Sequence, residues 1–206
     1  MKSLWGIALA LVCCSTVMVP SARAQGTVAF QNSSLTRVYY YGPSGFTFIP
    51  PGSLFSAELM YAPDGTPAEL FDAVAVRVGA PTAFGGSVMI PGIFQGGNRT
   101  APITPAGGFG LFQVRVWETA YGTDYASMLA SGNGQAGVST ILRVDTGNPT
   151  LIPPQTPTLL VTAGLTSFCV TPAFVTPACV PEPSVVVLGF AAAIAALLAF
   201  QKRSHS

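Results

Sequence analysis

The interior of the chain alternates between apolar and polar residues, a pattern typical of β-strands with one buried face. The alternation is most regular at Phe109–Glu118 and at residues 71–78, which predict the two strongest strands. In the first of these, two sets of side chains fall on opposite faces: Phe112, Val114 and Val116 on one, and Leu111, Gln113, Arg115 and Trp117 on the other.

Shorter runs predict further strands at residues 26–31, 36–41, 54–61, 140–144 and 166–170. Clusters rich in glycine, proline and aspartate predict turns at residues 41–45, 62–65 and 96–98. The only predicted helix covers residues 124–131 and ends at Gly132. Strands at this spacing without intervening helices predict an all-β fold with a single β-sandwich-like ectodomain, over residues 25–179.

The N-terminus has the features of a signal peptide. Lys2 precedes an apolar run over residues 4–19, Pro20 and Ser21 break that run, and Ala22-Arg23-Ala24 presents small residues to signal peptidase. We expect residues 1–24 to be removed by a cut between Ala24 and Gln25. The alternative is an uncleaved membrane anchor.

The C-terminus contains a second apolar segment. Residues 185–200 carry no charge, and as a helix they would extend about 24 Å, a little less than the hydrocarbon core of a bilayer. Lys202 and Arg203 follow in a basic tail, residues 201–206, and resist transfer across the membrane. These features predict a C-terminal transmembrane helix with its tail in the cytoplasm.

Just before this span stands Val180-Pro181-Glu182-Pro183. The order of this motif, an apolar helix and a basic stop resembles the PEP-CTERM sorting signal of Gram-negative bacteria, a tail also called an ice-binding protein C-terminal domain. The resemblance covers residues 180–206 and implies that an exosortase, a membrane-embedded cysteine transpeptidase, recognises the motif. In this family the tail usually has several arginines, whereas this chain has Lys202 and Arg203 only.

The middle of the chain also resembles an ectodomain type found with this tail in Verrucomicrobia-like bacteria. The resemblance lies in residues 26–32, 112–118, 125–130 and 137–139. It supports the β-rich architecture and implies no mechanism.

Charge argues against a nucleic-acid partner. The 206 residues carry a formal net charge of +1, but between residues 25 and 180 five arginines against seven acids leave −2, with no lysine. The charged residues of this segment are Arg37, Arg77, Arg99, Arg115, Arg143, Glu58, Asp64, Glu69, Asp72, Glu118, Asp124 and Asp145. No basic patch is available to neutralise phosphates.

The residues predict no catalytic machinery. The single histidine, His205, lies beyond the predicted span, so no Ser-His or Cys-His pair can form in the ectodomain. Asp64 lies in a turn sequence. Glu118 and Asp124 flank the Tyr121-Gly122 loop, an arrangement compatible with calcium but without the repeated acidic pattern of such sites. We expect no enzyme, no cofactor and no metal site.

Two further features leave alternatives open. Tyr39-Tyr40-Tyr41 places at least one ring outward, either as a platform for sugar rings or as part of a half-buried aromatic strand. Cys169 and Cys179 predict a disulfide, worth about 2–3 kcal/mol if unstrained. Two free buried thiols and an intermolecular bridge are the alternatives.

Together these features predict a non-enzymatic protein of the cell surface or extracellular matrix, exported and at least transiently anchored by its tail. A carbohydrate-binding or adhesive module is the first alternative, and a carboxylate-based glycan hydrolase is the second. The expected partners are an exosortase, the membrane and exopolysaccharide.

Overall fold

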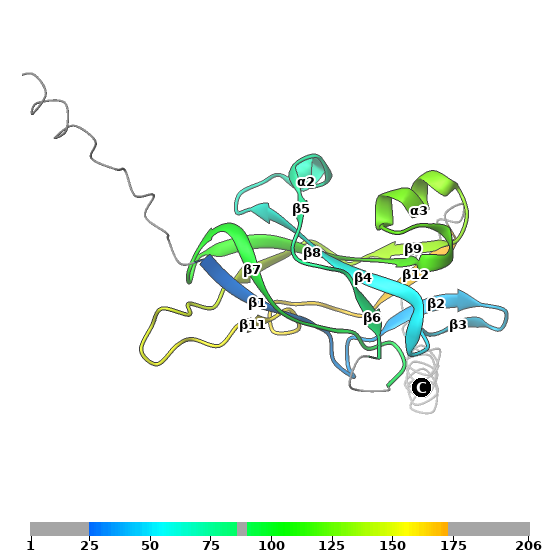
Figure 1. Cartoon of the computed structure of the whole chain (residues 1–206), viewed down its shortest axis with the longest axis horizontal. Coiled ribbons are helices and arrows are strands. Elements are labelled where there is room, and N and C mark those ends of the chain that lie inside the picture. Colours follow the sequence, from blue (N-terminus) through cyan, green and yellow to red (C-terminus); the bar gives the residue numbers. More distant parts are fainter. Residues whose placement is uncertain (1–24, 86–89, 173–206) are drawn as a thin grey trace, which may run out of the picture.

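The computed structural model describes residues 25–85 and 90–172. These residues form twelve strands and two short α-helices, so the all-β prediction is confirmed. The strands make up a large sheet and a small sheet (Figure 1).

Two long antiparallel neighbours, β4 (Gly52–Pro63) and β8 (Phe109–Glu118), form the centre of the large sheet. The strand order is β3-β2-β12-β9-β8-β4-β5, with β10 also paired to β8 and β6 also paired to β4. The shorter strands are β2 (Val38–Gly42), β3 (Gly45–Phe48), β5 (Val76–Arg77), β6 (Thr82–Phe84), β9 (Gln135–Val138), β10 (Leu142–Asp145) and β12 (Phe168–Pro172).

The small sheet has the order β11-β1-β7, with β1 (Gln25–Gln31) in the middle. Strand β7 (Gln95–Pro105) is antiparallel to β1, whereas β11 (Thr158–Leu159) is parallel to it. Alternate residues of β1, among them Val28 and Phe30, are fully buried.

One apolar core lies between the two sheets. Val28 and Phe30 of the small sheet belong to the same cluster as residues of the large sheet, which include Ala57, Leu59, Tyr61, Phe112, Val114 and Val116. The predicted division of Phe109–Glu118 into two faces is therefore confirmed, and Phe112, Val114 and Val116 form the face that points into the core. The burial follows from the two-residue period of a strand, which directs every second side chain into the core.

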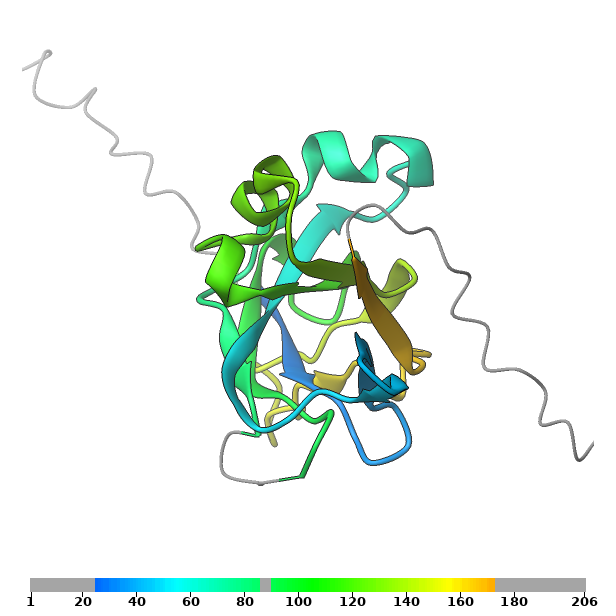
Figure 2. The same ribbon diagram turned by 90° about the vertical axis from the view of Figure 1, so that its right-hand side faces the viewer.

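The other face of the large sheet is covered in part by α2 (Phe71–Val74) and α3 (Tyr125–Ser131). Figure 2, at right angles to Figure 1, shows both helices at the top and β1 below the large sheet. Because α3 packs on this face, Trp117 is also buried although it points away from the core.

The predicted helix at residues 124–131 is confirmed, and local chemistry explains its limits. The Asp124 carboxylate accepts a hydrogen bond from the Ser127 backbone N–H at 2.7 Å, and the Ser127 hydroxyl accepts one from the Asp124 N–H. This capping box satisfies two backbone donors at the start of the helix. Gly132 then ends it with φ 68°, a conformation that glycine adopts without strain.

The strand predicted at residues 71–78 is wrong in its first half. A 3-10 turn, Ala68–Leu70, leads into helix α2, and only Val76–Arg77 pairs as a strand, with Tyr61 and Met60 of β4. The helical turn buries Phe71 against Met60 and Ala62, which lie outside the main core. This packing outweighs the strand preference of the valines.

The turn predicted at residues 96–98 is also wrong, since all three residues lie within β7. The pairing of β7 with β1 shifts register beside Phe30, and Gly97 has φ 74° at this bulge. At Gly96 an added Cβ would collide with the Phe30 ring. The glycines are therefore needed for a bulge and a close ring contact.

The remaining predicted strands are confirmed with small shifts in their limits. Residues 140–144 and 166–170 correspond to β10 and β12, each displaced by about two residues. Strands β3, β6, β7, β9 and β11 were not predicted. Within the described ranges, no helix has the length and apolar character needed to cross a membrane, and residues 185–200 lie outside them.

A pair of substitutions tests the helix at residues 71–74. Phe71 is 1% exposed and Val74 is 47% exposed, so Phe71→Ala should lower the free energy of unfolding by about 3 kcal/mol. Val74→Ala should lower it by less than about 0.5 kcal/mol. Urea unfolding of both variants measures the difference. Similar losses would favour a strand that buries the valines.

Candidate functional site

The β2–β3 hairpin carries an aromatic row on the outer face of the large sheet. Tyr39 and Tyr41 point outward, whereas Tyr40 packs against the core, with its ring centroid 5.3 Å from that of Phe55. On β3, Phe48 is the cross-strand partner of Tyr39, and Phe46 is the partner of Tyr41.

The rings of the row contact each other in pairs. The centroids of Tyr39 and Phe48 are 4.6 Å apart, and those of Tyr41 and Phe46 are 5.4 Å apart with their planes near perpendicular. Tyr41 is 50% exposed and Phe46 is 46% exposed. We call Tyr39, Tyr41, Phe46 and Phe48 the aromatic row. The three tyrosines divide between the core and the surface, so the prediction that at least one of their rings points outward is confirmed.

The hairpin is held firmly in place. A two-residue loop, Pro43-Ser44, joins the strands, and β12 pairs in parallel with β2 on its other side. That pairing ends where Val170 meets Tyr40. Beyond it, the Gln135 side chain continues the pairing: its Oε1 accepts from the Tyr41 N–H at 3.0 Å, and its Nε2 donates to the Tyr41 carbonyl at 2.8 Å.

Sequence reasoning missed the role of Gln135. Its amide lies 94 residues from Tyr41 and meets it only because β9 and β2 both lie beside β12. No local pattern marks a glutamine that substitutes for a strand partner. The consequence is that the most exposed ring of the row sits on a backbone bonded on both edges.

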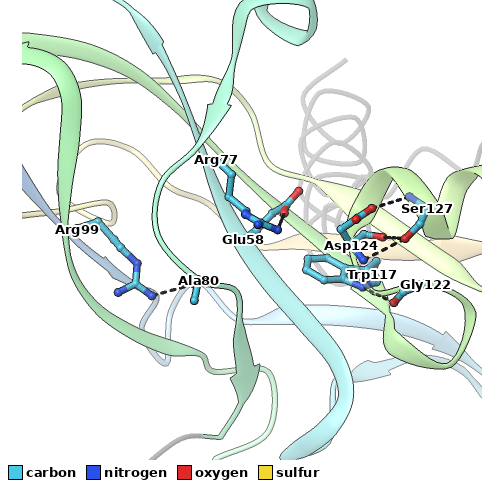
Figure 3. Close-up of polar contacts among 8 residues, drawn as sticks. All are labelled: Glu58, Arg77, Ala80, Arg99, Trp117, Gly122, Asp124 and Ser127. Atoms are coloured by element: carbon cyan, nitrogen blue, oxygen red, sulfur yellow. Dashed lines mark hydrogen bonds and ion pairs between the residues drawn. The ribbon is translucent and has the colours of Figure 1, made fainter.

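A second cluster lies on the outer face of β4 and β8, between α2 and α3. Glu58 of β4 is 5% exposed, and its Oε2 lies 3.8 Å from Nη1 of Arg77 (Figure 3). Burial raises the pKa of Glu58 above its ordinary value, and the positive charges of Arg77 and Arg115 partly oppose this effect.

Arg115 connects the two helices that cover this face. It forms an ion pair with Asp72 of α2, donates from Nε to the Gln113 side chain at 3.1 Å, and lies over the Tyr125 ring of α3 at 5.3 Å. These contacts use Nε, Nη2 and one face of the guanidinium group. The cluster of Glu58, Arg77 and Arg115 with Asp72 and Tyr125 therefore connects the large sheet to the two helices, and we call it the brace.

Two other acids considered in the sequence, Asp64 and Asp124, have structural partners. Asp64, in its predicted turn, receives two hydrogen bonds of 2.8 Å from Arg143, which lower the pKa of its carboxyl group. Asp124 caps α3, and the Ser127 N–H lowers its pKa. The loop after β8 is closed by the Trp117 indole N–H, which donates to the Gly122 carbonyl (Figure 3).

The calcium hypothesis gains no support from this arrangement. The Asp124 carboxylate is already engaged at the start of the helix. In the part of the chain that the structure describes, no group of three or more His, Cys, Asp or Glu residues gathers as metal ligands would.

Several predicted site residues lie outside the described ranges. They are Ala24, Cys179, the sorting motif at residues 180–183, Lys202 and Arg203. Gln25 is the first residue of β1, and Cys169 is half-buried in β12 beside Tyr39. The signal cleavage, the disulfide and the sorting signal therefore stay predictions.

Comparisons of the chain with protein-family models, with curated proteins and with solved structures find no match.

The buried carboxyl of Glu58 makes a prediction about pH. Its folded pKa is raised from 4.5, so the unfolded chain loses this proton at a lower pH than the folded protein does. This group therefore lowers stability as pH rises through 4.5 toward the raised value. Relative to the parent, Glu58→Gln should gain free energy of unfolding as pH rises through and above 4.5.

Asp64→Asn is the control for this experiment. Because the folded pKa of Asp64 is lowered, the stabilisation that its carboxylate provides is lost as pH falls below 3.8. Asp64→Asn lacks this carboxylate, so its free energy of unfolding should fall relative to that of the parent as pH rises through the same range. Urea unfolding at a series of pH values measures both differences. If the free energy of unfolding of Glu58→Gln relative to the parent stays constant or falls as pH rises, burial does not raise the pKa of Glu58.

Proposed function

We propose that the protein is an exported surface or matrix protein whose β-sandwich-like domain binds polysaccharide through the aromatic row. The observation that carries this proposal is the exposure of Tyr41 and Phe46 on a hairpin whose inner strand, β2, is hydrogen-bonded on both edges. Large apolar rings that face water in a group, and not singly, are characteristic of binding surfaces.

The row suits sugar rings for a physical reason. A pyranose presents a face of C–H groups that can lie against an aromatic ring, while its hydroxyl groups stay near polar partners such as the tyrosine hydroxyl. Tyrosine and phenylalanine have few rotatable bonds, so ordering them on binding costs little. The contacts within the row, at 4.6 and 5.4 Å between centroids, restrict them further before any ligand arrives.

A non-enzymatic role is supported by how the acids are used. Asp64 is held by Arg143, Asp72 by Arg115, and Asp124 by the start of α3. Glu58, whose raised pKa would suit a general acid, is buried beside Arg77 in the brace between sheet and helices. The row and this brace serve separate purposes, one facing solvent and the other facing the helices.

Substitutions in the row test the binding proposal. Tyr41→Ala and Phe46→Ala should each weaken binding to a retained polysaccharide about tenfold or more, because each removes an exposed ring from the platform. Affinity electrophoresis in gels with and without soluble polysaccharides measures the change. Tyr121→Ala is a matched control, since Tyr121 is 45% exposed but lies outside the row. Equal effects of the three substitutions would contradict the assignment of the row.

We further propose that residues 180–206 act as a transferable sorting signal. The apolar span would hold the exported chain in the membrane, and Lys202 with Arg203 would stop its passage, because moving charge through hydrocarbon is costly. This leaves Pro181-Glu182-Pro183 at the outer boundary of the membrane. The prolines favour an extended backbone there, which a membrane-embedded transpeptidase can reach.

Glu182 separates a sorting signal from a simple anchor. In a host with an exosortase, Glu182→Ala should accumulate as unprocessed, membrane-bound precursor, whereas Glu69→Ala, which removes an exposed acid of the domain, should be processed like the parent. Immunoblots of membrane and extracellular fractions measure the two forms. Normal processing of Glu182→Ala would refute the sorting proposal.

A further inference from the structure

Arg37 extends the aromatic row at one end. It lies two residues before Tyr39, and the alternation of a strand therefore places it on the same face as Tyr39 and Tyr41. Its guanidinium carbon is 4.7 Å from the centroid of the Phe48 ring. From Arg37 to Tyr41 the backbone spans about 13 Å, the length of a short oligosaccharide segment.

The hydrogen-bonding groups of Arg37 are unused within the described part of the chain. Its Nε is buried and has no hydrogen-bond partner there. The ion pairs of the described residues belong to Arg77, Arg115 and Arg143, so no described carboxylate neutralises Arg37. Stacking on Phe48 engages the face of the guanidinium and leaves the Nη groups at its edge available to a ligand.

Two other arginines show what an engaged group looks like in this domain. Arg99 also has a buried Nε without a partner, but its Nη2 donates to the Ala80 carbonyl at 3.0 Å (Figure 3). Arg143 also stacks on a phenylalanine, Phe109, at 3.7 Å, yet Asp64 binds it with two hydrogen bonds. Arg37 also stacks on a phenylalanine, but it has no carboxylate partner among the described residues.

This difference indicates the missing partner. Neither Nη group of Arg37 has a hydrogen bond or ion pair among the described residues, and the planar fork that these two groups form matches the two oxygens of a carboxylate. The rest of the ectodomain offers no general attraction for polyanions, since residues 25–180 carry more acids than bases. An anionic ligand at this face would therefore depend on Arg37 itself.

We propose that the aromatic row selects acidic polysaccharides, with a uronic acid carboxylate on Arg37 and neighbouring sugar rings on Tyr39, Tyr41 and Phe46. This inference rests on the proposed polysaccharide-binding function and names its ligand class. Arg37 supplies the choice between acidic and neutral polymers, and the rings supply contacts common to both.

The test compares polygalacturonate with its fully methyl-esterified form, which has the same sugar rings without the charge. The parent domain, within the full exported chain, should bind polygalacturonate about tenfold more tightly than the ester. Arg37→Gln should bind both polymers with the affinity that the parent shows for the ester. Arg37→Lys should lose most of the preference too, because an ammonium group is a point charge without the fork.

Arg143→Gln is the matched control, an arginine that also stacks on a phenylalanine but is already neutralised. It should keep the preference of the parent. Dextran sulfate compared with dextran separates carboxylate from sulfate, and the carboxylate assignment predicts the stronger discrimination in the uronic acid pair. Urea unfolding of each variant verifies that its fold is retained.

The outcomes separate the two proposals. If the parent binds both polymers equally and Tyr41→Ala weakens both, polysaccharide binding by the aromatic row is supported and the proposed role of Arg37 is wrong. If the preference for polygalacturonate survives in both Arg37 variants, charge elsewhere is responsible and the inference is overturned. If neither polymer is bound by the parent, the polysaccharide-binding proposal and this inference are both refuted.

Discussion

The antiparallel pairing of β4 with β8 is the interaction on which the rest of the structure depends. Nine consecutive residue pairs, from Phe55 with Glu118 to Pro63 with Gly110, align the two strands without a register shift. A slip of one residue would exchange the two faces of a strand. This register directs Leu59 and Val114 into the core and Glu58 and Arg115 to the opposite face. The strands that lead outward to the β2–β3 hairpin are then added beside β8.

Two features depart from the usual separation of apolar interior and polar surface. Glu58 is a buried acid, and the aromatic row exposes large rings. The first departure is compensated inside the molecule, because Arg77 and Arg115 lie near the carboxylate and Arg115 in turn contacts α2 and α3. The second has no such compensation among the described residues, and Arg37 at its end keeps unsatisfied donors. A buried charge that has partners within the protein indicates a structural role. Exposed rings and an arginine without such partners are the basis for proposing a ligand at the aromatic row.

Local signals in the sequence were sufficient for several parts of the fold. The two faces of β8 follow from alternation alone, and the limits of α3 follow from Asp124, Ser127 and Gly132, which act within one turn of the helix. The turn at Asp64 and the outward position of at least one tyrosine in residues 39–41 are of the same kind. Each of these depends on neighbours a few residues away, so no knowledge of the rest of the chain is needed.

Contacts between distant segments decided what remained. Residues 71–78 have the valines of a strand, but Phe71 finds its burial against Met60 and Ala62, and a helical turn results. Gly96 and Gly97 have the composition of a turn, but in the structure they lie in β7 beside Phe30 of β1. The amide of Gln135 reaches Tyr41 across 94 residues of sequence. The sequence alone determined which residues alternate and where a helix is capped, because those effects are short-range. Only the tertiary structure decided which rings face solvent, which arginines keep an unsatisfied donor and which carboxylate is buried, because those depend on strand neighbours that the chain order does not specify.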